Sequence, residues 1–293
     1  MSPKLSEIPI FMKELKKNQP RLRLNRRDVE IFHLLFEYRV LTAEQLSGYY
    51  NIPWKRDGGL ARRLQRLAQM GYILNPSQAP TAHHYVLGDG GAEILRSEYQ
   101  NLMPRSGSWD AFGERLRPSA FNEHDKLVVD YMLALEKQNR EADEPFLIRR
   151  TDILARPNLG ARKLPLAWTT ELFWNGQYHD VRVCPDWVYG IVDEQGRERV
   201  YFLEMDMGTE PQVRNAFDRN QSILRKLLSY AHTYEQKSAL EDVGIERFSV
   251  VFSVPSERRK SNMQKLCEQY LEGMVPRSLI EIRTRGSTSA KYG

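Results

Sequence analysis

Three carboxylates stand at the borders of two neighbouring apolar segments of the chain. Asp186 directly precedes the segment WVYGIV, and Glu204 and Asp206 lie near the end of the segment VYFLEMDM, starting eighteen residues later. Two such segments joined by a polar turn form adjacent strands, so we expect Asp186 and Glu204 to converge. Two carboxylates with a backbone carbonyl form a hard oxygen site for Mg²⁺ or Mn²⁺. A metal at this site could activate water and stabilise the departing oxygen in phosphodiester cleavage.

Side-chain alternation adds Asp206 to this candidate site. Residues two apart on a strand project from the same sheet face, so Glu204 and Asp206 are expected on one face. Two acids on a mostly apolar strand are costly unless they bind a cation or are hydrated. We therefore predict that Asp186 and Glu204 ligate a metal, and that Asp206 ligates it or orients water.

A second group of residues has the chemistry of nucleic-acid binding. Leu60, Leu64 and Leu67 are spaced to form one buried stripe of a helix, which leaves the arginines between them on the outer side. Arginine contacts phosphates and reads guanine edges. The residues predicted to contact double-stranded DNA are Lys55, Arg56, Arg62, Arg63 and Arg66. A solvated basic face of a helical bundle, or a protein-binding surface, remains an alternative.

The elements around this basic helix predict a winged helix-turn-helix in residues 1–102. Asn25 and Thr42 are good N-caps for two preceding helices, and the basic helix begins near Gly58. The runs 72–74 and 84–87 flank a turn-rich segment and predict a β-hairpin, which a short helix follows. Three helices and a hairpin in this order place the third helix in the major groove.

The rest of the chain predicts a second domain. Residues 103–118, MPRSGSWDAFGERLRP, have the composition of a linker. From 119 to 293 we expect a helix at 119–139, strands at 146–154, 187–192 and 200–205, a helix at 212–235, a strand at 248–254, a helix at 258–272 and a short apolar run at 279–282. Residues 167–183 look less regular. The core order α-β-β-β-α-β indicates an α/β sandwich with a mixed sheet, so the chain as a whole is of the α+β or α/β class.

Charge and composition agree with a DNA-binding protein. The net charge is +5, and residues 1–118 contain 18 Lys and Arg against 12 Asp and Glu, whereas the remaining residues contain 25 against 26. A basic half is typical of phosphate-binding modules. The two cysteines are too few for a disulfide scaffold. Because we find neither an apolar run of about 18 residues nor a secretory signal, we expect a cytoplasmic protein with no membrane partner.

The spacing of the acids on this core resembles the PD-(D/E)xK restriction-endonuclease-like superfamily over roughly residues 119–255. This resemblance implies a further acid from the preceding helix, matched by Glu123 in NEHDKL, with His124 beside it. It also implies a lysine two residues after the strand acid, where this sequence has Asp206. Some superfamily members carry the lysine on the following helix, a position matched by Lys226, with Tyr230 four residues later. Lys226 could equally be an ordinary exposed lysine.

The combination of both halves is similar to the replication-relaxation family of plasmids and other mobile elements. The segments that carry this resemblance are RRLQRLAQMGYI, NEHDKLVVDYML, PDWVYGI, FLEMDMGTEP and KLLSY. It implies DNA processing in replication, mobilisation or control of such an element.

Two functions remain open from the sequence. The first is a DNA-binding protein whose second domain nicks or cleaves plasmid DNA with Mg²⁺ or Mn²⁺. The second is a non-catalytic DNA-binding regulator, which would need no metal and would use a degenerate nuclease fold for dimerisation or partner contact; Asp206 in the lysine position favours it. A homodimer is plausible in either case because winged-helix proteins often bind two half-sites.

Overall fold

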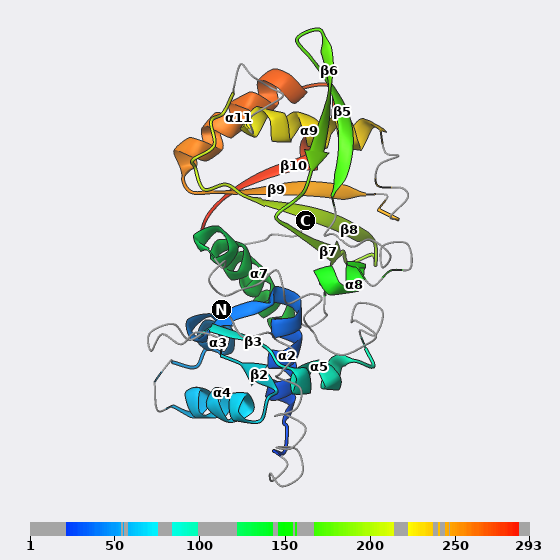
Figure 1. Cartoon of the computed structure of the whole chain (residues 1–293). Coiled ribbons are helices and arrows are strands. Elements are labelled where there is room, and N and C mark those ends of the chain that lie inside the picture. Colours follow the sequence, from blue (N-terminus) through cyan, green and yellow to red (C-terminus); the bar gives the residue numbers. More distant parts are fainter. Residues whose placement is uncertain are drawn as a thin grey trace, which may run out of the picture.

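The computed structural model describes two regions that pack on each other (Figure 1). The described residues are 22–53, 55, 58–75, 84–98, 122–142, 146–154, 156, 167–213, 222–236, 240, 244–245 and 247–286. We call residues 22–98 the helical region and residues 122–286 the sheet region. Together they form a mixed α+β structure. The predicted linker, 103–118, lies outside the described residues.

The helical region contains four helices and a small sheet among its described residues. Its elements in order are α2 (Arg26–Tyr38), β1 (Val40–Thr42), α3 (Ala43–Tyr50), α4 (Gly59–Gln69), β2 (Ile73–Leu74), β3 (His84–Leu87) and α5 (Asp89–Leu95). The strands are antiparallel in the order β1-β3-β2. Asn25 and Thr42 each form a capping box at the start of α2 and α3, so both predicted helix starts are confirmed.

The sheet region is built on a five-stranded sheet in the order β10-β9-β8-β7-β4. Strands β8, β9 and β10 are parallel, and β7 is antiparallel to both β8 and β4. The predicted mixed sheet is therefore confirmed. The elements in order are α7 (Glu123–Glu141), β4 (Leu147–Ile148), α8 (Arg150–Leu154), β5 (Trp168–Trp174), β6 (Gln177–Val183), β7 (Trp187–Val192), β8 (Glu198–Met205), α9 (Ile223–Gln236), β9 (Phe248–Val254), α11 (Glu257–Leu271), a 3₁₀ turn (Arg277–Leu279) and β10 (Ile280–Thr284).

Helices cover both faces of this sheet (Figure 1). The alternation along β8 sends Phe202 into the core beneath α9 and α11, and sends Leu203 and Met205 into the core shared with α7. The core shared with α7 continues without a break into α2, α3 and α4 of the helical region. At this junction the ring of Trp187 stacks on Tyr38, with ring centroids 5.5 Å apart. The two regions therefore share one hydrophobic core.

Two segments differ from the sequence-based expectation. The strand expected at 146–154 is a two-residue strand followed by α8, because the buried Glu37 carboxylate accepts the N–H groups of Arg150 (2.9 Å) and Thr151 (3.0 Å) and so caps the first turn of α8. The stretch expected to be irregular at 167–183 is the antiparallel hairpin β5–β6. Its turn, Asn175–Gly176, has positive φ at both residues, as two-residue hairpin turns require.

Helix α9 also begins later than expected. The sequence suggested a helix from 212, whereas α9 starts at Ile223, and residues 214–221 are not described. The described part of the segment between β8 and α9, residues 206–213, is not helical. This non-helical segment carries one of the acids of the site described next.

Candidate functional site

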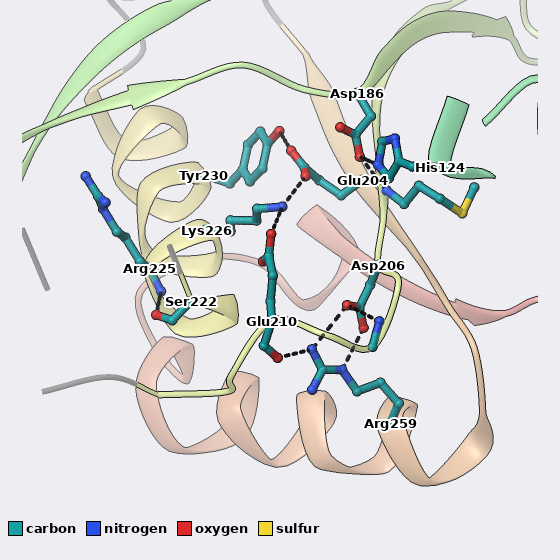
Figure 2. Close-up of polar contacts among 12 residues, drawn as sticks. His124, Asp186, Glu204, Asp206, Glu210, Ser222, Arg225, Lys226, Tyr230 and Arg259 are labelled. Carbon is teal, nitrogen blue, oxygen red and sulfur yellow. Dashed lines mark hydrogen bonds and ion pairs between the residues drawn. The ribbon is translucent and has the colours of Figure 1, made fainter. Parts of the chain in front are cut away.

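Asp186 joins three elements at one edge of the sheet region (Figure 2). It lies between the end of β6 and the start of β7. Its Oδ2 accepts the backbone N–H of Met205 in β8 at 2.7 Å and lies 3.1 Å from Nε2 of His124, in the first turn of α7. The hydrogen bond with Asp186 raises the pKa of His124 above its ordinary value. Asp186 is therefore fixed beside the end of the strand that carries Glu204.

Glu204 is buried on the face of β8 that α9 covers, with only 4% of its surface exposed. Its Oε1 accepts the hydroxyl of Tyr230 at 2.6 Å, and its Oε2 lies 3.1 Å from Nζ of Lys226. Burial raises the pKa of Glu204 to about 7; the Lys226 charge lowers it, and Asp186 raises it further. Lys226 and Tyr230 are one helical turn apart on α9, so both reach the same carboxylate.

Lys226 contacts a second acid that the sequence analysis missed. Its Nζ lies 3.1 Å from Oε1 of Glu210, in the non-helical segment after β8. Burial disfavours the ammonium charge, but Glu204, Glu210 and Asp186 together raise the pKa of Lys226 above its ordinary value. The sequence feature that could have predicted this contact is the position of Glu210: it lies shortly after a buried strand, in a loop that starts at the candidate site.

Asp206 projects toward the same helical layer as Glu204, as the alternation predicted, but both of its oxygens are engaged elsewhere. Oδ2 lies 2.6 Å from Nε of Arg259 on α11, and Oδ1 accepts from Nη2 of Arg259 at 3.1 Å and from the Gly208 N–H at 2.9 Å. The side chain of Asp206 is 2% exposed. The structure therefore pairs Asp206 with an arginine and does not bring it into the contacts among Asp186, Glu204 and Lys226 (Figure 2).

Glu123, the acid expected from α7, lies on the surface. Its side chain is 64% exposed, and its Oε2 is 4.0 Å from Nζ of Lys126. The next residue, His124, makes the contact to Asp186. The helix thus supplies an imidazole to the site in place of the expected carboxylate.

Residues 32–245 match the family model described as Replication-relaxation. The chain belongs to the replication-relaxation family. The match covers most of the chain, from α2 to the segment before β9, and includes Asp186, Glu204 and Lys226. No curated protein and no solved structure matches the chain. Family membership suggests a role in the replication or mobilisation of a plasmid or other mobile element.

The basic helix of this replication-relaxation protein, α4, presents only part of the expected surface. Arg62 and Arg66 are exposed, as is Lys55 just before the helix. Arg63 is half-buried: its Nε donates to Oδ1 of the fully buried Asp28 at 2.8 Å, and its Nη2 forms an ion pair with the other oxygen. Arg63 therefore fastens α4 to α2. Arg56 lies outside the described residues.

No group of three or more His, Cys, Asp or Glu side chains in the described part of the replication-relaxation chain forms a ready metal site. None of its described helices is long and apolar enough to cross a membrane. Any metal bound at Asp186 and Glu204 would therefore need ligands beyond the described protein side chains.

Proposed function

We propose that this replication-relaxation protein binds double-stranded DNA through α4 and nicks or cleaves it, with Mg²⁺ or Mn²⁺, at the Asp186–Glu204–Lys226 cluster. The observation that carries the proposal is the convergence of two carboxylates and a lysine from separate elements at one edge of the sheet. Metal-dependent phosphodiester cleavage needs this combination of metal-binding oxygens and a cation that stabilises developing negative charge.

The order of elements supports the two domain types in this proposal. The sequence α2-β1-α3-α4-β2-β3, with the strands in one small sheet, fits a winged helix-turn-helix in which α4 is the recognition helix. The sequence α7-β4-β7-β8-α9-β9 fits the α-β-β-β-α-β core of restriction-endonuclease-like domains, with α8 and the β5–β6 hairpin inserted. A homodimer on two half-sites is part of the proposal.

The residues present fit a divalent ion that arrives with DNA. Mg²⁺ commonly binds through one or two carboxylates and completes its shell with substrate phosphates and water, which agrees with the pair Asp186 and Glu204. Burial and the nearby Asp186 raise the pKa of Glu204, so a cation between these acids would relieve unfavourable charge. A bound metal would supply Lewis acidity and a nucleophilic water.

The protein residues have separate roles in this proposal. Asp186 and Glu204 hold the metal. His124 and the Met205 N–H orient Asp186, and the Tyr230 hydroxyl orients Glu204. Lys226 lies against Glu204 and stabilises negative charge that develops on the scissile phosphate.

The test of cleavage is the nicking of supercoiled plasmid DNA. We expect nicking by the wild-type protein with Mg²⁺ or Mn²⁺, none with a chelator, and a rate about 100-fold lower for Asp186→Ala, as for loss of one electrostatic group in other enzymes. Glu194→Gln, an exposed acid in the β7–β8 turn, is the matched control and should nick normally. Equal rates for wild type and Asp186→Ala would exclude the cluster as a nuclease site.

A non-catalytic accessory function has one specific observation in its favour. Asp206 stands in the position where the superfamily lysine is expected and is held by Arg259, while Lys226 and Tyr230 already satisfy Glu204. A protein of this kind would bind DNA and use the sheet region to contact a second copy or another protein. Normal DNA binding without nicking under any metal condition would support this second function.

DNA binding is tested through the two exposed arginines of α4. Replacing Arg62 and Arg66 together by alanine should weaken binding at least about tenfold and reduce the slope of log K against log salt by roughly two, because two phosphate contacts are lost. Gln65→Ala, exposed on the same helix, is the control. Fluorescence anisotropy with a DNA duplex at several salt concentrations measures both quantities, and an unchanged slope would contradict the assignment of α4.

A further inference from the structure

We infer that Arg259 is a positioning residue: paired with Asp206, it holds the segment after β8 so that Glu210 shares Lys226 with Glu204. The inference deepens the proposed function, since it concerns the same site. It also gives Asp206 a role that does not require metal binding. We call the paired side chains the Asp206–Arg259 clamp.

The clamp fixes both ends of a short turn. Arg259 donates from Nε and Nη2 to the two oxygens of Asp206, at 2.6 and 3.1 Å, and the same Nη2 donates to the backbone carbonyl of Glu210 at 2.7 Å. Inside the turn, the Gly208 N–H donates to Asp206 at 2.9 Å. The guanidinium of Arg259 therefore joins Asp206, which directly follows β8, to the backbone of Glu210 (Figure 2).

A second arginine, Arg285, directly follows β10 and supports the clamp. Nη2 of Arg285 donates to the backbone carbonyl of Asp206, and the Arg285 N–H donates to the carbonyl of Val254 at 2.9 Å. The Asp206 N–H in turn donates to Ser253 at 3.0 Å. The Asp206 end of the turn is thus tied to the central strands. At the other end, the carbonyls of Pro211 and Gln212 accept the N–H groups of Ile223 and Leu224 at 3.1 and 3.0 Å, and Arg259 adds the contact to the carbonyl of Glu210 itself.

Glu210 is held mainly through its backbone. Its Oε1 contacts Lys226 at 3.1 Å, whereas its Oε2 is buried and has no hydrogen-bond partner among the described residues. Leaving a buried acceptor unpaired costs free energy, so the side-chain contacts of Glu210 alone do not explain its position. We therefore attribute that position to the contacts of its backbone. The carbonyl contact to Arg259 supplies that placement.

The consequence for Lys226 is a shared contact. With Glu204 and Glu210 each 3.1 Å from Nζ, the ammonium lies between two carboxylates of different elements. Glu204 alone would leave the lysine free to rotate with its flexible stem. Glu210 holds the Lys226 amine in a position that faces Glu204. The ion pair between Glu210 and Lys226 can persist when a ligand binds Glu204.

The test compares four variants of the full-length protein by three measurements. Glu210→Gln removes the charge that holds Lys226, Arg259→Ala removes the clamp, and Arg259→Lys keeps the charge without the two-pronged contact. Arg258→Ala, exposed on the same helix, is the matched control. The measurements are amine labelling of Lys226 at one fixed pH followed by mass spectrometry, hydrogen exchange of the Gly208 amide, and plasmid nicking.

We expect Lys226 labelling to rise several-fold in Glu210→Gln and Arg259→Ala, to rise less in Arg259→Lys, and to stay at the wild-type level in Arg258→Ala. Gly208 should exchange faster in both Arg259 variants and normally in Glu210→Gln, a split that a general loss of stability would not produce. Arg259→Ala leaves Asp206 buried without its partner and can unfold the chain. In that case the inference is tested by Glu210→Gln and Arg259→Lys.

Wild-type labelling of Lys226 in Glu210→Gln, or wild-type exchange of Gly208 in Arg259→Lys, would overturn the inference. The failure of the proposed function looks different: labelling and exchange change as expected, while the wild-type protein nicks no DNA with any metal. If the wild type nicks, we expect nicking by Glu210→Gln and Arg259→Lys to fall several-fold.

Discussion

Replacing Arg149 by alanine is expected to destabilise the protein by about 3–5 kcal/mol. Arg149 donates to both oxygens of Glu136, at 2.6 and 2.9 Å, and the Glu136 side chain is 2% exposed. The Tyr38 hydroxyl donates to the same carboxylate at 3.2 Å. Without Arg149, a buried charge between the two regions keeps only one neutral donor. Urea denaturation of wild type and variant gives the difference in unfolding free energy.

Two comparisons make this expectation specific. Arg197→Ala breaks an exposed ion pair with Asp193 and should cost less than about 1 kcal/mol. A triple variant, Tyr38→Phe, Glu136→Leu and Arg149→Leu, removes the buried charges and the hydroxyl together and should recover most of the lost stability, since apolar replacements of buried ion pairs are often tolerated. If Arg149→Ala is no more destabilising than Arg197→Ala, the Glu136–Arg149 pair does not hold the junction.

The second large effect is a pH dependence of stability that comes from Glu204. An acid whose pKa is higher in the folded state binds its proton more tightly there, so folding loses stability as pH rises. For Glu204 the loss begins near the ordinary glutamate pKa of 4.5 and is complete above about 7. The difference between these values corresponds to about 3 kcal/mol. The glutamine of Glu204→Gln cannot ionise, so this variant does not lose stability by this route as pH rises.

The measurement is the difference in unfolding free energy between Glu204→Gln and wild type at several pH values from 4.5 to 8. That difference should move by about 3 kcal/mol in favour of the variant as pH rises. His124 titrates in both proteins, so its main contribution cancels. A constant difference between Glu204→Gln and wild type over this range would contradict the raised pKa of Glu204.

Local patterns were sufficient for the central strands and for part of the site. The runs at 187–192 and 248–254 are mostly apolar and contain several β-branched residues, and they form strands with those bounds. Lys226 and Tyr230 reach Glu204 because a four-residue spacing puts them on one face of α9. In these cases the deciding pattern, an apolar run or a four-residue spacing, lies within one element.

The misplaced residues depend on partners distant in the sequence. Helix α8 is capped by Glu37, 113 residues before it, and Arg63 is drawn inward by Asp28. Asp206 and Glu210 take their positions from Arg259 on a later helix. Neither periodicity nor composition predicts these contacts between distant residues, because they form only when separate elements pack together.

The hydrophobic core that runs from the helical region into the sheet region has a geometric consequence for the proposed reaction. Since α4 packs through one continuous core onto the elements that flank Asp186 and carry Glu204, we expect the distance between α4 and these two acids to vary little. A duplex seated on Arg62 and Arg66 would meet the carboxylates at an unvarying offset in base pairs. Nicks would then map to a single phosphate at a fixed distance in base pairs from the bound sequence. In a dimer they would map to two phosphates related by symmetry.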